Sequence, residues 1–255
     1  MESEDAIYKR YSAAFAFERV QLDPIIRNTV TYTTLSHRWG EEEPAYSVAG
    51  TLEGQGPGYE KLDQFLKASM DRGIMFAWAD TCCIDKGSSA ELDEAIRSMF
   101  HWYENSTLCL VHLAQTSGYE DMDRDEWFER GWTLQELLAP PRVKFFDKNW
   151  IPLTCHANDK SSRRNQLIQK ISTITGISEQ IFIGTSQSNA IFSVPINERI
   201  AWATYRFTTR VEDAAYSLMG MMRVSIQTAY GEGWGKSFRR LFEAIVQEGT
   251  DPSVL

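Results

Sequence analysis

Apolar positions follow two alternating spacings along the first 150 residues, and these spacings predict alternating strands and helices. Segments rich in apolar, β-branched and aromatic residues predict β-strands at 30–36, 74–79, 107–113 and 142–147. Between them, apolar residues recur every three or four positions, which predicts helices over 59–72, 89–105 and about 130–139. Alternation of this kind is typical of an α/β domain with a mainly parallel central sheet and right-handed crossovers. The unbroken apolar run 74–79 further predicts a strand that is covered on both faces.

After residue 150 the pattern contains helices but no further strand. Amphipathic spacing predicts helices over 166–175, 178–182, 194–206, 212–221 and 236–248. Nothing between the two halves resembles a flexible linker. We therefore interpret residues 1–255 as a single domain, with an α/β core at about 30–150 and a C-terminal helical extension at about 151–250. Residues 8–18 predict at most one amphipathic turn.

The segment around residues 130–139 places a tryptophan and a carboxylate together. Pro140 must end the helix, and at about 100° per residue one side carries Leu134, Leu137 and Leu138. Trp132 and Glu136, four residues apart, share the other side. A carboxylate beside an indole in a cleft is partly desolvated, which favours its protonated form. The alternative is a solvated Glu136 on an amphipathic helix, with Trp132 as a half-buried packing residue.

Polar and aromatic residues are concentrated where the predicted strands end. In a parallel sheet, ligands bind outside the carboxyl ends of the strands. Those ends are residues 36–39, residues 80–85, and the loop and helix that follow Leu113. The sequence therefore predicts one cleft formed by all three segments.

Composition and charge exclude several classes of function. The formal net charge of −9 and the pI of about 5.1 argue against a nucleic-acid-binding or anionic-membrane-binding protein. The four cysteines and four histidines lack metal-ligand spacing, so we expect no metal site. No secretory signal or membrane-spanning run is present, which predicts a cytoplasmic protein. The glycine-rich stretch 230–237 fails the Walker spacing, and we interpret it as a turn before the last helix.

Three sequence blocks resemble a known family. In chain order they are YTTLSHRWG at 32–40, WADTCCIDK at 78–86 and RGWTLQE at 130–136, and together they resemble the fungal heterokaryon incompatibility (HET) domain. Residues 209–220 and 230–233 resemble the tail that is usual in HET domains of incompatibility receptors with a nucleotide-binding module. The resemblance covers about residues 30–245. Arg38 departs from it, because many members carry a different residue there.

The resemblance implies a domain that triggers regulated cell death in fungal non-self recognition and innate immunity. HET domains are considered similar to Toll/interleukin-1 receptor (TIR) domains, whose sheet is flavodoxin-like. TIR enzymes cleave NAD with a glutamate that matches Glu136, and the neighbouring aromatic position matches Trp132. The implied activity is that of an NAD glycohydrolase, with NAD or a related nucleotide as substrate and no cofactor. The implied partners are further copies of the chain, since oligomerisation completes such sites, and an upstream NOD-like receptor or nucleotide-binding module.

Two functional hypotheses remain open at this stage. In the first, Glu136 is the catalytic carboxylate that stabilises a ribose cation as neutral nicotinamide leaves. The expected substrate-binding residues are Ser36, His37, Arg38, Trp132, Asp80 and Asp85. For Asp80 and Asp85, fixing their loop is an equal alternative. In the second hypothesis the chain is a non-enzymatic, self-assembling death-signalling module. A nucleotide-binding regulator built on Gly231–Gly235 is a third possibility, which the spacing disfavours.

Overall fold

The computed structural model describes residues 30–47, 54–161, 165–183 and 187–249. The turn expected at 8–18 lies outside these ranges. The chain divides into two compact units, residues 1–31 and 32–255, and the second contains all elements described below. Within the described ranges, no helix has both the length and the apolar character needed to cross a membrane.

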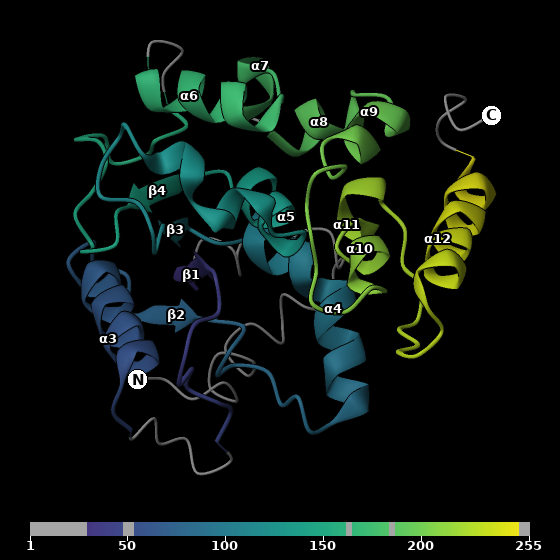
Figure 1. Cartoon of the computed structure of the whole chain (residues 1–255), viewed down its shortest axis with the longest axis horizontal. Helices are drawn as coiled ribbons and strands as arrows, with labels where there is room; N and C mark the ends of the chain where they lie inside the picture. The colour runs from purple at the N-terminus through teal and green to yellow at the C-terminus, as the bar shows by residue number, and fades with distance from the viewer. Residues whose placement is uncertain (1–29, 48–53, 162–164, 184–186, 250–255) are drawn as a thin grey trace, which may run out of the picture. The chain divides into compact units, whose positions relative to one another are not determined.

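A four-stranded sheet forms the centre of the larger unit. All strand pairs are parallel, and the order is β2-β1-β3-β4. The strands are β1 (Tyr32–His37), β2 (Phe76–Trp78), β3 (Leu108–His112) and β4 (Val143–Phe146), labelled in Figure 1. This order is that of a flavodoxin-like sheet, in which β2 is added on one side of β1 and the later strands are added on the other, so the strand order reverses between β1 and β3. The predicted α/β, flavodoxin-like fold is confirmed.

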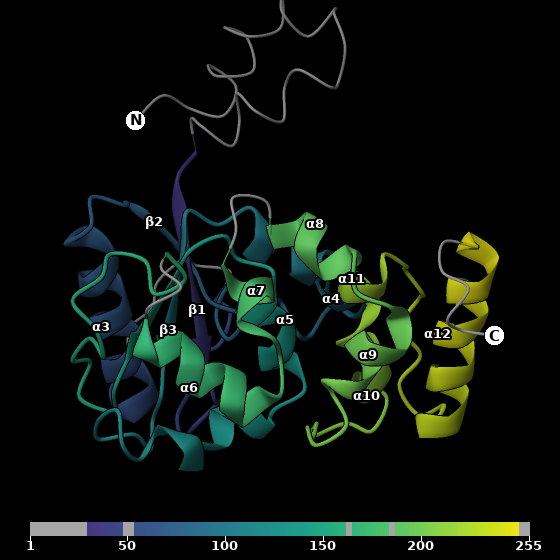
Figure 2. The same cartoon turned by 90° about the horizontal axis from the view of Figure 1, so that it is seen from above.

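Helices cover both faces of this sheet (Figure 2). One face carries α3 (Pro57–Met70), and the other carries α4 (Ser89–Glu104) and α5 (Trp132–Leu138). Successive residues of β1 point to opposite faces, so Leu35 packs in one apolar cluster with Leu62 and Phe65 of α3. Ser36 consequently points toward the face of α4 and α5.

Local residues mark where these helices begin and end. The Ser88 hydroxyl caps α4 by accepting a hydrogen bond from the Glu91 backbone N–H at 3.3 Å. Gly73, just beyond α3, has a φ of 73°, which a glycine adopts without strain. The loop before α5 contains two short 3₁₀ turns that the sequence pattern did not predict, η2 (Met122–Arg124) and η3 (Glu126–Glu129).

The expectation that residues 74–79 form a strand covered on both faces is wrong. Only three of these residues form β2, which pairs with β1 alone and lies at the edge of the sheet. Met75 is 76% exposed and Phe76 is 54% exposed. An apolar run therefore does not distinguish a central strand from an edge strand, because position in the sheet depends on pairing with distant residues.

The second half of the chain is helical, as predicted, but its helices are more numerous than the five that the pattern indicates. They are α6 (Gln166–Thr175), α7 (Glu179–Phe182), α8 (Gln187–Phe192), α9 (Ile196–Ala201), α10 (Asp213–Tyr216), α11 (Met219–Met222) and α12 (Trp234–Glu248). In Figure 1, α6 to α9 form a row along the top of the view, and the yellow α12 lies at the right-hand side. Their buried apolar residues share one core with α4, α5 and β3.

Two of the predicted helices in this extension differ from the structure. The helix expected over 194–206 ends at Ala201, and the one expected over 212–221 is divided into α10 and α11. The early end of α9 has a clear cause. The Phe207 N–H donates to the Glu129 carbonyl and the Gly131 N–H donates to the Phe207 carbonyl, so this segment pairs with the chain before α5 instead of continuing a helix.

Candidate functional site

The side chain of Glu136 is held against the carboxyl end of β1. The Ser36 hydroxyl donates to Glu136 Oε2 at 2.6 Å, and the Trp127 indole N–H donates to Ser36 Oγ at 2.9 Å. Ser36 and Trp127 are fully buried, and Glu136 is 7% exposed. The interpretation of Glu136 as a solvated surface residue is therefore wrong. The three leucines of α5 are buried as predicted, while Glu136 and the half-buried Trp132 share the expected second side of the helix.

Burial changes the protonation of Glu136. Its pKa is raised to about 8, first by desolvation and second by the negative charge of Asp80. The hydrogen bond from Ser36 and the positive charge of Arg130 act in the opposite direction but do not offset burial. At neutral pH the carboxyl group is therefore mostly protonated. A cation placed beside it would favour the carboxylate and release a proton.

A cavity of about 260 Å³ lies in front of Glu136. It borders the chain segments after β1 and β2, the helices α4 and α5, and the extension. Its lining residues are His37, Trp39, Asp80, Ile84, Lys86, Leu92, Ile96, Met99, Arg130, Trp132, Glu136, Thr209, Arg210, Asp213 and Tyr230. The volume is slightly below the range of about 300–1,000 Å³ typical of small-molecule sites, so it holds part of a large ligand such as a dinucleotide.

Four of the residues predicted to form the site border this cavity. They are Glu136, Trp132, His37 and Asp80. Asp80 accepts a hydrogen bond from the Trp39 indole N–H at 2.8 Å. His37 borders the cavity, but its Nε2 lies 3.7 Å from Glu43 Oε1, and by strand alternation its ring points toward the face of α3. The structure thus brings together the three segments that the sequence predicted to converge.

Ser36, Arg38 and Asp85 do not line the cavity. Ser36 lies behind Glu136 and orients it. The Arg38 guanidinium forms an exposed ion pair with Glu126 at 2.7 Å. The Asp85 carboxylate accepts from the Gly87 backbone N–H at 2.8 Å, so it fixes a turn, as the alternative interpretation of this residue anticipated.

The extension contributes a wall of the cavity that the sequence analysis did not assign. Asp213 accepts from the Trp132 indole N–H at 3.2 Å and from the Tyr230 hydroxyl at 2.8 Å. Asp213 is 9% exposed, and desolvation raises its pKa. Tyr230 is presented by the glycine turn, whose Gly231 and Gly233 N–H groups donate to Glu212 at 2.9 and 3.0 Å. Asp213 and Tyr230 fall within residues 209–220 and 230–233, which resemble the tail of HET domains. That resemblance was the feature of the sequence that could have assigned them to the site.

The same extension also holds the N-terminal end of α5. The Arg206 guanidinium donates to the Arg130 carbonyl and to the Thr133 hydroxyl, both at 2.9 Å. Gly131 lets this part of the extension approach closely, because a Cβ atom at residue 131 would lie 2.5 Å from Thr208 Cγ2 and would force Thr208 to shift. The helix that carries Glu136 and Trp132 is consequently positioned by residues more than seventy positions later in the chain.

The described residues contain no group of three or more His, Cys, Asp or Glu side chains placed to hold a metal ion.

Comparison with known proteins assigns the chain to a family. The family model described as "Heterokaryon incompatibility protein (HET)" matches residues 32–124. The Vegetative incompatibility protein HET-E-1 of Podospora anserina is 40% identical over 228 residues, which are 84% of this chain and 16% of that protein. No solved structure matches. The family match contains the first two of the three sequence blocks, the longer alignment covers most of the chain, and together they show that the chain belongs to the heterokaryon incompatibility (HET) family.

Proposed function

We propose that this chain is a cell-death effector domain of fungal heterokaryon incompatibility that acts by cleaving NAD at the nicotinamide–ribose bond. The observation that carries the proposal is the buried Glu136 carboxyl group, hydrogen-bonded to Ser36 at the carboxyl end of β1 and facing a cavity. The similarity to a vegetative incompatibility protein supports the biological role. The resemblance to TIR domains supports the reaction.

In the proposed reaction, the bond between ribose C1′ and the ring nitrogen breaks, and its electron pair neutralises the positively charged nicotinamide ring. The remaining ribose is an oxocarbenium ion, which the Glu136 carboxylate stabilises. Water then attacks C1′ and loses a proton, which gives ADP-ribose; capture by a group of the same molecule would give a cyclic product. No acid is needed for the leaving group, because nicotinamide leaves as a neutral molecule.

The raised pKa of Glu136, about 8, couples this reaction to substrate binding. The nicotinamide ring of NAD is a cation, and a cation beside a carboxyl group lowers its pKa. Substrate would therefore generate the carboxylate that the reaction needs. Trp132 offers an aromatic face beside Glu136 against which the ring can stack.

One observation favours the alternative of a self-assembling module without enzymatic activity. Tyr205 is 84% exposed and Phe207 is 71% exposed, although both belong to the segment that holds the start of α5. Large exposed aromatic residues often mark protein interaction sites. Contacts between copies at this segment would also serve an enzyme whose site depends on assembly, so the carboxyl group must be tested directly.

The test compares the wild-type chain with Glu136→Gln, a change that keeps the size of the side chain but cannot form a carboxylate. Both proteins are incubated with NAD at high concentration or clustered on a scaffold, and the products are separated by chromatography. We expect the variant to lose at least about 1,000-fold of the cleavage rate, and to lose cell killing. Glu243→Gln, on an exposed position of α12, is the matched control and should retain both.

Cell killing by Glu136→Gln at normal protein levels would support the self-assembling module instead. Killing lost together with NAD cleavage, in a variant that remains folded and at least as stable as the wild type, would support the enzyme.

A further inference from the structure

Charged groups are segregated by depth within the cavity. The carboxyl groups of Glu136 and Asp213 are 7% and 9% exposed, and Asp80 is half-buried. The basic side chains Lys86 and Arg210 line the same cavity from exposed positions. The two most buried of these carboxyl groups therefore lie inside and the two exposed cations lie toward solvent, while Asp80 and Arg130 are both half-buried. Such a gradient matches a ligand whose buried end is cationic and whose outer part is anionic.

The two exposed cations are held by contacts that leave hydrogen-bond donors available. Arg210 lies over the ring of Tyr230 at 4.0 Å, and a stacked guanidinium keeps its N–H edges free. Lys86 lies over the ring of Trp39 at 4.3 Å and uses one donor on the Thr81 carbonyl at 2.8 Å. Among the described residues, none accepts a hydrogen bond from the Arg210 guanidinium.

Arg130 is a third cation of the cavity, and its charge acts on Glu136. It is half-buried, it lines the cavity, and its charge lowers the pKa of Glu136. Its guanidinium likewise donates no hydrogen bond to another part of the described chain. Guanidinium forks bind phosphate oxygens in pairs, and they do so best where water is partly excluded.

We propose that Lys86, Arg130 and Arg210 form a diphosphate-binding rim that selects a dinucleotide and orients it with its cationic ring innermost. This inference rests on the proposed function and extends it, because it assigns the part of the site that distinguishes a dinucleotide from a free nucleoside. The cavity of about 260 Å³ accommodates a ring and its ribose. The diphosphate then falls at the mouth, where Arg210 and Lys86 lie, and the second nucleoside remains outside.

The experiment measures ligand binding to the full chain carrying Glu136→Gln, so that NAD is not consumed. Isothermal titration calorimetry compares NAD with nicotinamide riboside, which has the same cationic ring and ribose but no phosphate. Arg210→Ala and Lys86→Ala should each weaken NAD binding by about tenfold, and leave nicotinamide riboside within about twofold. Arg210→Lys should recover part of the loss, because it restores the charge but not the fork.

Two further measurements strengthen this test. Raising the salt concentration should weaken the binding of NAD more than that of nicotinamide riboside, because exposed cations are screened. Lys67→Ala and Arg239→Ala remove exposed cations outside the cavity and should change neither affinity.

The rim is disproved if NAD affinity survives both alanine substitutions, if the two ligands lose affinity equally, or if neither ligand binds. These outcomes are separate from the fate of the proposed reaction. A wild-type chain that leaves NAD intact, while its Gln variant binds NAD through the rim, would overturn cleavage and retain this site. NAD cleavage that is unaffected by Arg210→Ala and Lys86→Ala would overturn the diphosphate-binding rim and retain the proposed reaction.

Discussion

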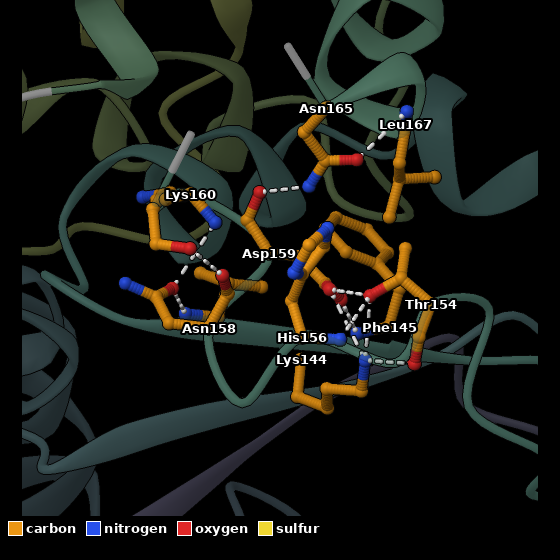
Figure 3. A network of polar contacts seen from close by, with 11 residues as sticks. Lys144, Phe145, Thr154, His156, Asn158, Asp159, Lys160, Asn165 and Leu167 are labelled. Carbon is orange, nitrogen blue, oxygen red and sulfur yellow. Dashed lines mark hydrogen bonds and ion pairs between the residues drawn. The ribbon is translucent and has the colours of Figure 1, made fainter. Parts of the chain in front are cut away.

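Asp159 and Glu136 are both buried carboxyl groups, yet the structure surrounds them very differently. Asp159 is fully buried and forms an ion pair with Lys144 at 3.1 Å. It also accepts from the Phe145 backbone N–H at 2.8 Å and from the Thr154 hydroxyl, a network drawn in Figure 3. This network joins the segment after β4 to the edge of the sheet.

Glu136 lacks this compensation. It accepts a hydrogen bond from Ser36, but no lysine or arginine of the described chain forms an ion pair with it, and Asp80 adds a like charge. One side of Glu136 faces a cavity. A buried carboxylate that is fully paired stabilises one arrangement of the chain, whereas an uncompensated one beside a cavity can interact with a ligand. Burial alone therefore does not identify a functional carboxyl group, but burial without an ion-pair partner does favour one.

The largest loss of stability is expected when a buried charge loses its ion-pair partner. Asp159→Ala leaves the Lys144 ammonium group, whose side chain is 3% exposed, without its counter-charge. Breaking one partner of a buried pair typically costs about 3–5 kcal/mol, so we expect a loss of that size in urea unfolding. Asp123→Ala removes an exposed ion pair with Lys170 and should change stability by less than about 1 kcal/mol.

A double substitution separates charge burial from packing at this position. Lys144→Met with Asp159→Leu removes both charges and should recover part of the stability that Asp159→Ala loses. If the double variant is less stable than Asp159→Ala, the hydrogen bonds to Asp159 matter more than its charge, and the comparison with Glu136 loses its electrostatic basis.

At Glu136, by contrast, removal of the carboxyl group is expected to raise the stability of the protein. Its pKa is raised from 4.5 to about 8 on folding, so the folded state keeps a proton that the unfolded state releases between these values. The stability contributed by the proton is full below pH 4.5 and decreases as the pH rises to 8. Glu136→Gln does not titrate, and it should be more stable than the wild type by roughly 3 kcal/mol at pH 7. The difference should vanish near pH 4, and urea unfolding at both pH values measures it.

A smaller effect concerns the pH dependence of cleavage. If the carboxylate is the active form, kcat/KM should rise about tenfold per unit up to pH 8 and then level off. Asp80→Asn removes the second cause of the raised pKa, so the profile should move to lower pH. Asn can still accept the hydrogen bond from Trp39. A profile that remains in place in this variant would mean that Asp80 does not influence Glu136.

The sequence predicted those parts of the site whose geometry is local. Trp132 and Glu136 are four residues apart, and helical geometry alone places them together on the side of α5 opposite its leucines. Likewise, the polar residues that follow β1 and β2 lie close together because the carboxyl ends of parallel strands meet at one edge of the sheet. The order itself, and so the edge position of β2, depends on pairing between distant segments.

The parts that escaped prediction depend on long-range packing. Asp213 accepts a hydrogen bond from Trp132 across 81 positions and also accepts one from Tyr230, and periodicity carries no information over the first separation. Lys144 lay within an apolar predicted strand, but its partner Asp159 follows a loop whose path the sequence does not specify. The tail blocks of the HET resemblance marked the right segments without indicating their roles.

The smallest effect is expected at Arg38, where the expected role and the geometry disagree. Arg38 was an expected substrate-binding residue, yet its guanidinium pairs with Glu126 at 2.7 Å on an exposed surface outside the cavity. Surface ion pairs contribute about 0–1 kcal/mol. Arg38→Ala should therefore change the rate of NAD cleavage by less than about twofold and the free energy of unfolding by less than about 1 kcal/mol. Rates measured on clustered protein test this. A large loss of cleavage with unchanged stability would mean that assembly moves Arg38 from Glu126 into the site, and the cavity of the single chain would then lack one of its cations.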